Sequence, residues 1–252
     1  MNTRQDEVLG LLGVERWSLR DEPARALKPA GASPVPQMAV ENSSAVMPVV
    51  PTLVPAVAID WEALRAQVKD CTRCKLCQTR TNTVFGVGNA AAPLMVVGEG
   101  PGADEDASGE PFVGRAGKLL DEMLKAIGRS RSDNGPAQLP GNVFIANVVK
   151  CRPPGNRDPE KDEVEACRGY LDAQIAHVKP KLIVALGRIA AQRLLGSEEP
   201  LSRLRGPLHR YGAGGTPVFV TYHPAYLLRS PKEKAKSWED LKKIAQHLKA
   251  HG

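Results

Sequence analysis

The stretch LMVVGEGPG, which runs from Leu94 to Gly102, decides the fold. It joins a short apolar run, typical of a buried strand, to a loop that is rich in glycine. Three more strand-like runs follow, at Val143–Val148, Lys181–Leu186 and Val218–Tyr222. A segment with helical patterning follows each strand, near 116–127, 160–178, 188–195 and 236–250. This alternation predicts an α/β fold of three layers (αβα) around a central four-stranded parallel sheet.

Polar side chains follow the ends of these strands. The first strand ends in the loop from Gly98 to Gly102, the second near Asn147, the third in Gly187-Arg188 and the fourth in His223-Pro224. Right-handed crossovers bring the carboxyl ends of parallel strands to one edge of the sheet, where open α/β sheets bind their ligands. We therefore expect an acid, an amide and an imidazole to meet in one crevice.

The glycine-rich loop and Asn147 each have two interpretations. The loop is not G-x-G-x-x-G and lacks the G-K-[ST] of a P-loop, so it favours a backbone-lined site for an anion or a flat ring over a dinucleotide site. Its alternative is a tight turn that needs positive φ. Asn is depleted in strands, so Asn147 is expected either to read the edge of a nucleobase or to bond backbone at a bulge.

The segment after His223 has the composition of a nucleic-acid contact. Pro224-Ala225 is followed by Tyr226, Leu227 and Leu228 and then by Arg229. Apolar residues beside cations are typical of a wedge with phosphate contacts. The alternative for the lysines at 232, 234 and 236 is a solvated start of the last helix.

Five cysteines occur, three at C-x2-C-x2-C spacing from Cys71 to Cys77 and a pair at Cys151 and Cys167. An odd number without a secretory signal argues against a disulfide framework and for a reducing compartment. Thiolates at these spacings can hold zinc or an iron–sulfur cluster, with the far pair folding back to complete four ligands. One cysteine is then left over.

The first 59 residues differ in composition from the rest. A short helix or a tail is expected over 1–20, and an Ala/Pro/Val-rich linker over 21–59, with a single charge between Gly31 and Ile59, at Glu41. From Asp60, a plausible N-cap for a helix over 61–69, the chain becomes a globular domain that we place at 60–252. Residues 1–60 carry a net charge of −2 and the remainder +8, which favours a polyanionic partner for that domain.

Taken together and in this order, the motifs resemble those of the family 4, or iron–sulfur, uracil-DNA glycosylases over about residues 65–249. The resemblance rests on Cys71-Thr72-Arg73-Cys74, Gly98-Glu99-Gly100-Pro101-Gly102, Glu110-Pro111-Phe112-Val113-Gly114, Asn147-Val148-Val149-Lys150-Cys151-Arg152-Pro153-Pro154, Asn156-Arg157, Cys167 and His223-Pro224-Ala225-Tyr226-Leu227-Leu228-Arg229. The N-terminal 60 residues lie outside it and inherit nothing.

The resemblance implies a [4Fe–4S] cofactor on Cys71, Cys74, Cys151 and Cys167. Cys77 stands where the family needs no cysteine and is an alternative ligand. The cluster is expected to be structural in the base-excision step. It would pin the 151–167 loop, with Arg152 and Arg157, against DNA.

The resemblance also implies the residues that bind uracil. These are the loop Gly98, Glu99, Gly100, Pro101 and Gly102, with Phe112 as stacking ring, Asn147 on the base edge, His223 at O2 and Glu105 near the pyrimidine 5-position. Uracil would be flipped out of DNA and its N-glycosidic bond hydrolysed, leaving an abasic site for base excision repair. One related family has Asp where Gly100 stands, so we expect a largely dissociative step, with Glu99 and Asn156 as candidates to position water.

Other readings lead to different expectations. The sister group that crosslinks to uracil-DNA does so through a histidine in an inserted loop, and residues 148–166 contain no histidine. A nucleotidyl-transfer site would need paired Asp residues to hold a metal ion, and the sequence does not provide them. The main alternative is a non-catalytic nucleic-acid-binding module with structural zinc. For the glycosylase we expect single- or double-stranded uracil-containing DNA as partner, a cytoplasmic, nucleoid-associated monomer, no membrane contact, and a possible protein partner for the N-terminal extension.

Overall fold

The computed structural model describes residues 60–132 and 142–251, all of which belong to one compact unit. The short helix or tail expected over 1–20 and the linker expected over 21–59 lie outside these residues. The strands are β1 (Val87–Gly88), β2 (Leu94–Gly98), β3 (Val143–Asn147), β4 (Leu182–Leu186), β5 (His209–Tyr211) and β6 (Thr216–Thr221). The α-helices are α2 (Trp61–Lys69), α3 (Ala103–Ser108), α4 (Arg115–Ala126), α5 (Lys161–Val178), α6 (Arg188–Leu195), α7 (Leu201–Leu204), α8 (Pro224–Arg229) and α9 (Lys234–His251).

The sheet confirms the predicted parallel core but is larger than expected. Its strand order is β1-β3-β2-β4-β6-β5, and the inner four strands pair in parallel. The expectation of four strands is wrong, because β1 and β5 add antiparallel edges. Both edge strands are short and neither is buried, so no apolar run marked them in the sequence.

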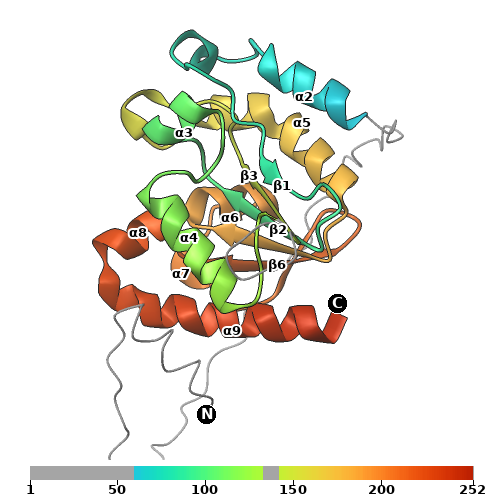
Figure 1. Ribbon diagram of the computed structural model, residues 1–252, viewed down its shortest axis with the longest axis vertical. Coiled ribbons are helices and arrows are strands. Elements are labelled where there is room, and N and C mark those ends of the chain that lie inside the picture. Colours follow the sequence, from blue (N-terminus) through green and yellow to red (C-terminus); the bar gives the residue numbers. More distant parts are fainter. Residues whose placement is uncertain (1–59, 133–141, 252) are drawn as a thin grey trace, which may run out of the picture. The chain divides into compact units, whose positions relative to one another are not determined.

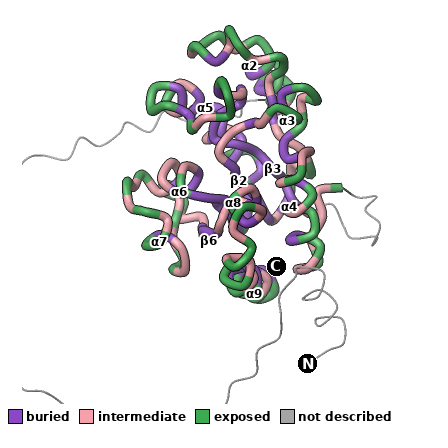
Figure 2. The backbone as a smooth tube through the Cα atoms, turned by 90° about the vertical axis from the view of Figure 1, so that its left-hand side faces the viewer, coloured by how far each residue is buried: buried purple, intermediate pink, exposed green. Residues whose placement is uncertain are grey.

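Helices cover both faces of the sheet, as three layers require (Figure 1). Side chains of α2, α5 and α6 pack on one face, where alternate strand residues such as Val97 and Ala146 point. Side chains of α4, α8 and α9 pack on the other face, against residues such as Val96 and Ile145. The four inner strands are almost entirely buried, and Figure 2 shows β2 and β3 as buried tube within the fold.

Local sequence explains where several elements begin. The Asp60 side chain accepts a hydrogen bond from the backbone N–H of Ala63 at 3.4 Å, which confirms it as the N-cap of α2. Pro224 occupies the first turn of α8, where its missing N–H costs nothing. None of the helices in the described residues is long and apolar enough to cross a bilayer.

Candidate active site

A cavity of about 400 Å³ opens at the carboxyl edge of the parallel strands. The structure brings together there the acid, the amide and the imidazole that the strand order predicted. Its walls come from the loop after β2, the turn before α4, the end of β3, the segment after it and the start of α8. The lining residues are Glu99, Gly100, Pro101, Gly102, Glu105, Phe112, Ala116, Asn147, Pro153, Asn156, Arg157, Asp158, His223, Ala225 and Arg229.

Asn147 ends β3 directly opposite Gly98 of β2. Its side chain is 2% exposed, and its Oδ1 atom has no hydrogen-bond partner among the described residues. A buried amide oxygen without a partner is costly, so a ligand that supplies a donor is the expected occupant of the cavity. Gly98 makes room for this arrangement, because a Cβ there would lie 2.6 Å from the Phe112 ring atom Cζ and closer still to Oδ1 of Asn147.

The Phe112 ring lines the cavity close to the end of β3 and is held by strained backbone. Its φ of 56° is in the left-handed region, which non-glycine residues seldom adopt. Arg131 holds this turn by donating to the carbonyl oxygens of Pro111 at 2.8 Å and Phe112 at 3.1 Å. Gly117 of α4 packs so closely beneath the Phe112 carbonyl that no Cβ fits there. The ring is thereby fixed with its centroid 5.5 Å from that of His223.

Glu105 joins the two loops that frame the cavity. One carboxylate oxygen accepts from the backbone N–H groups of Val113 at 2.9 Å and Gly114 at 3.1 Å. The other accepts from the N–H of Gly102 at 3.1 Å. Glu105 lines the cavity, as the resemblance implies, but both of its oxygens already bind backbone. Its part in the site is therefore also to fix the Phe112 turn against the glycine-rich loop.

His223 follows β6 and caps α8. Its Nδ1 atom accepts a hydrogen bond from the backbone N–H of Ala225 at 3.2 Å. Because a backbone N–H only donates, the neutral ring carries its proton on Nε2. Burial, together with the positive charge of Arg229, lowers the pKa of His223 to about 4. At neutral pH the ring is an uncharged donor.

Glu99 sits in an unusual electrostatic environment. Burial, and then the nearby Asp158 carboxylate, raise the pKa of Glu99 to about 7, while Arg188 opposes the shift. Arg188 in turn pairs with Asp158 at 2.7 Å. Titration near neutrality suits a group that handles a proton or orients water. Asp158 was not singled out from the sequence, because nothing in its neighbours shows that it folds back onto the loop after β2.

The structure separates the residues that were predicted to contact DNA. Tyr226 and Arg229 are exposed beside the cavity and Leu228 is half-buried. The assignment of Leu227 to the DNA surface is wrong, because α8 turns this side chain into the core, where it is 1% exposed. The helix start at Pro224 fixes that rotation, and the apolar run by itself did not reveal it.

Arg152, Asn156 and Arg157 follow β3 and are tied to protein groups, and of the three only Asn156 and Arg157 line the cavity. Arg152 donates to the Asn156 side chain at 2.7 Å, and Asn156 itself is exposed with a φ of 56°. Arg157 pairs with the buried Glu163 carboxylate at 2.7 Å. Arg157 thus anchors the loop to α5 and is less free for phosphate than its sequence context indicated.

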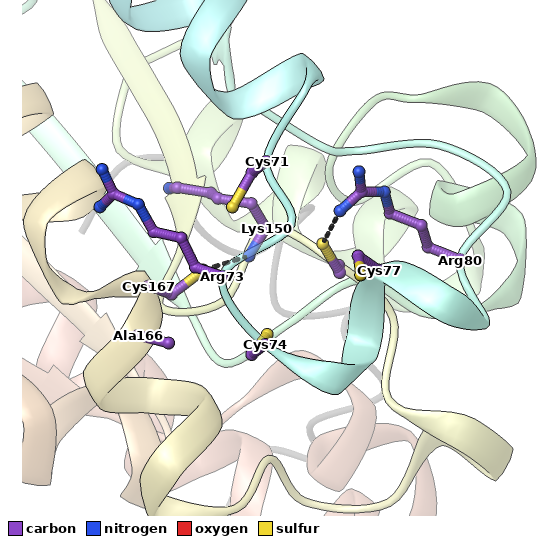
Figure 3. A pocket seen from close by; sticks show the side chains of 9 residues that line it. Cys71, Arg73, Cys74, Cys77, Arg80, Lys150, Ala166 and Cys167 are labelled. Carbon is purple, nitrogen blue, oxygen red and sulfur yellow. Dashed lines mark hydrogen bonds between the residues drawn. The ribbon is translucent and has the colours of Figure 1, made fainter.

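A second cavity collects the cysteines (Figure 3). All five line it, together with Arg73, Arg80, Lys150 and Ala166. Arg80 donates to the Cys151 sulfur at 3.1 Å, and the backbone N–H of Lys150 donates to the Cys167 sulfur at 3.4 Å. Burial raises the pKa of the Cys151 thiol to about 11, and Arg80 opposes this shift.

The donor chemistry of this cavity fits an iron–sulfur cluster. Soft thiol ligands gathered around one space, with N–H groups directed at the sulfurs, are the surroundings in which such clusters are held. Within residues 60–132 and 142–251, no three Cys, His, Asp or Glu side chains form a group that could hold a metal ion. The fit therefore rests on the shared cavity and on its hydrogen bonds, and Cys77 lines the cavity like the other four.

Comparison with known proteins gives a consistent result. The family model described as the uracil DNA glycosylase superfamily matches residues 85–245. A type-4 uracil-DNA glycosylase of Archaeoglobus fulgidus is 45% identical over 186 residues, which cover 71% of this chain and 89% of the relative. One of Thermotoga maritima is 43% identical over 195 residues, or 76% and 96% of the two chains.

The type-5 uracil-DNA glycosylases match this chain less well than the type-4 proteins do. A type-5 uracil-DNA glycosylase of Thermus thermophilus is 32% identical over 152 residues, which cover 56% of this chain and 68% of the relative. The type-4 proteins are thus both more similar and more fully covered. The chain belongs to the uracil DNA glycosylase superfamily and, within it, to the type-4 uracil-DNA glycosylases.

Proposed function

We propose that this chain, a DNA glycosylase by family, binds a flipped uracil in the cavity at the strand ends and hydrolyses its N-glycosidic bond. The observation that carries the proposal is the unpaired, buried Oδ1 atom of Asn147, in a cavity that also holds the Phe112 ring and the Nε2–H donor of His223. A base inside a duplex cannot reach such a cavity, so the nucleotide must leave the stack.

Uracil recognition follows from the donors and acceptors. The Asn147 amide offers an acceptor for uracil N3–H and a donor for O4, a pattern that cytosine does not match. Phe112 supplies a flat apolar surface for stacking, and its strained, braced backbone keeps the ring in place before the base arrives. The stacking surface for uracil is therefore already in position in the free protein.

Bond cleavage sends negative charge into the departing uracil, mainly onto O2. A neutral His223 with its proton on Nε2 donates to that oxygen as the charge appears. One such donor is typically worth about 3–4 kcal/mol in the transition state. Gly100 supplies no carboxylate, which supports a dissociative step with late capture of water.

Glu99 is the better candidate to orient that water. Its carboxyl group lines the cavity and titrates with a pKa of about 7, so its carboxylate form is accessible under ordinary conditions. Asn156 is exposed, and its side-chain oxygen already accepts from Arg152. We therefore propose that Glu99 orients the water molecule that completes the hydrolysis.

We further propose that Cys71, Cys74, Cys151 and Cys167 hold a [4Fe–4S] cluster. When bound, it supplies a structural crosslink between the segment that precedes η1 (Lys75–Gln78) and the region from the end of β3 to α5. Iron binding requires thiolates, so assembly releases the proton that burial holds on Cys151.

Two measurements test the proposed function. Purified protein is incubated with a single-stranded oligonucleotide that contains one uracil, without added Mg²⁺, and abasic sites are cleaved with alkali. Strand cleavage at the uracil position, and none in a thymine control, supports it. Metal content separates the alternative: zinc without uracil release would instead indicate a non-catalytic nucleic-acid-binding module.

A further inference from the structure

Lys150 is fully buried and lies between the two cavities. Its side chain is 1% exposed, and no other lysine in the described residues is buried. Its ammonium group donates to the backbone oxygen of Asn147 at 2.8 Å and to Oε1 of Gln174 at 2.6 Å. Both partners are neutral oxygens, so no opposite charge offsets the cost of burying the ammonium group. An apolar side chain of similar size at this position would cost less free energy.

Gln174 is oriented so that it can serve this ammonium group. Its own side-chain nitrogen donates to the backbone oxygen of Phe85 at 2.8 Å, which turns Oε1 toward Lys150. Gln174 is fully buried on α5, two turns after Cys167 on the same helix. The Lys150 side chain thus ties the end of β3 to the helix that carries a proposed cluster ligand.

The main chain of Lys150 completes the connection. Its N–H donates to the Cys167 sulfur at 3.4 Å, and its carbonyl oxygen accepts from Val84 at 2.8 Å. On the other side of the same segment, the N–H groups of Val148 and Val149 donate to the carbonyl oxygens of Gly98, which ends β2, and of Glu99. Every peptide from Asn147 to Lys150 is therefore held by at least one hydrogen bond.

We propose that Lys150, oriented by Gln174, is a positioning residue that fixes the Asn147 peptide and thereby aims its side-chain amide at the base. The reasoning is geometric: a hydrogen bond to the Asn147 carbonyl restricts rotation of the backbone that carries the amide, and reading a base edge requires that direction to be fixed in advance. The same residue connects base reading to the cysteine cavity, so a disturbance at Cys167 reaches Asn147 through one residue.

The inference rests on the proposed function and is tested with Lys150→Met in the full chain. Met fills much of the same volume but cannot donate a hydrogen bond. The expected result is a single-turnover excision rate lower by about 10- to 100-fold, as for a small misplacement of a reacting partner. Affinity for undamaged DNA, iron content and visible absorbance are expected to match the parent protein. Lys181→Met, on an exposed lysine that precedes β4, is the matched control and should change nothing.

Gln174→Leu keeps the experiment decisive if Lys150→Met does not fold. It removes the orienting partner, leaves the lysine in place and should give a smaller rate loss of the same kind. A parental excision rate in a folded, iron-replete Lys150→Met protein overturns the inference. So does loss of iron with a parental rate per remaining iron, because Lys150 would then serve only the cysteine cavity. Absence of uracil release by the parent protein would contradict the proposed function itself.

Discussion

The imidazole of His223 accepts, through Nδ1, a hydrogen bond from the backbone N–H of Ala225, at 3.2 Å. This contact does two things at once: it caps α8, and it leaves the ring proton on the other nitrogen. Helix capping thereby determines which tautomer lines the cavity. The sequence places His223 at the strand end, but only this contact shows that the ring is a donor.

Replacing His223 with Ala is expected to lower the single-turnover excision rate by about 100- to 1,000-fold, because the donor acts on charge that develops only in the transition state. Binding of uracil-containing DNA should weaken much less. Rates and binding titrations are compared with His251→Ala, an exposed histidine at the end of α9. Equal losses in rate and in binding would make His223 a positioning residue and contradict the leaving-group role.

The pH dependence of the reaction should reflect Glu99 rather than His223. Since the pKa of Glu99 is raised to about 7, its carboxyl group is neutral below that pH and ionised above it. The single-turnover rate is therefore expected to rise through about pH 7, and Glu99→Gln should remove this rise. The pKa of His223, lowered to about 4, keeps the imidazole neutral over the same range. If the rate of Glu99→Gln still rises through pH 7, the titrating group is not Glu99.

The same shift has a consequence for stability, and its sign can be worked out. The folded protein binds a proton on Glu99 up to about pH 7, whereas an ordinary carboxyl loses it near 4.5. The stabilisation from that proton is complete below about 4.5 and is lost as pH rises through 7. The melting temperature of the parent protein should therefore fall more between pH 5 and pH 8 than that of Glu99→Gln.

Phe112→Ala should weaken binding of the flipped base by about 1–3 kcal/mol, the usual value of one base–aromatic stack. The measurement is the affinity for uracil-containing DNA relative to undamaged DNA. Phe112→Tyr, which keeps the ring, serves as the control. An unchanged affinity in a folded Phe112→Ala protein would mean that the ring only fills the core.

The two kinds of cysteine should respond differently to substitution. Purified without oxygen, the parent protein is expected to contain about four irons per chain. Cys167→Ala removes a proposed ligand and should lose iron, colour and solubility, whereas Cys77→Ala should keep them. Iron analysis and visible spectra decide between the two. If Cys77→Ala loses its colour and Cys74→Ala keeps it, the ligand assignment is wrong.

Arg229 and Leu227 lie on opposite sides of α8 and provide a direct contrast. Arg229→Ala should weaken DNA binding and reduce its salt dependence by about one phosphate contact, with little effect on folding. Leu227→Ala should instead lower the free energy of unfolding by about 2–5 kcal/mol, because it empties a buried site. Salt titrations of binding and denaturant melts of both variants test this. A stable Leu227→Ala protein with weakened DNA binding would restore Leu227 to the DNA surface.

The sequence predicts those parts of the fold that depend on local pattern. Buried parallel strands are continuous apolar runs, and crossover handedness places their ends together, so Asn147 and His223 could be assigned to one cavity. The edge strands β1 and β5 could not be predicted, because they are defined by backbone pairing and not by an apolar run. Arg131, Asp158 and Lys150 act on groups that are distant in the chain or hidden by burial, and single residues carry no local sign of such contacts.

The order in which the two cavities are completed along the chain bears on how the protein is made. The last cysteine is at 167, whereas the imidazole stands at 223, after β4 and β6. During synthesis, all of the cysteines therefore emerge well before the histidine that is proposed to stabilise the departing uracil. A growing chain can therefore gather the residues of the cysteine cavity before it has the imidazole of the proposed active site, which follows β6.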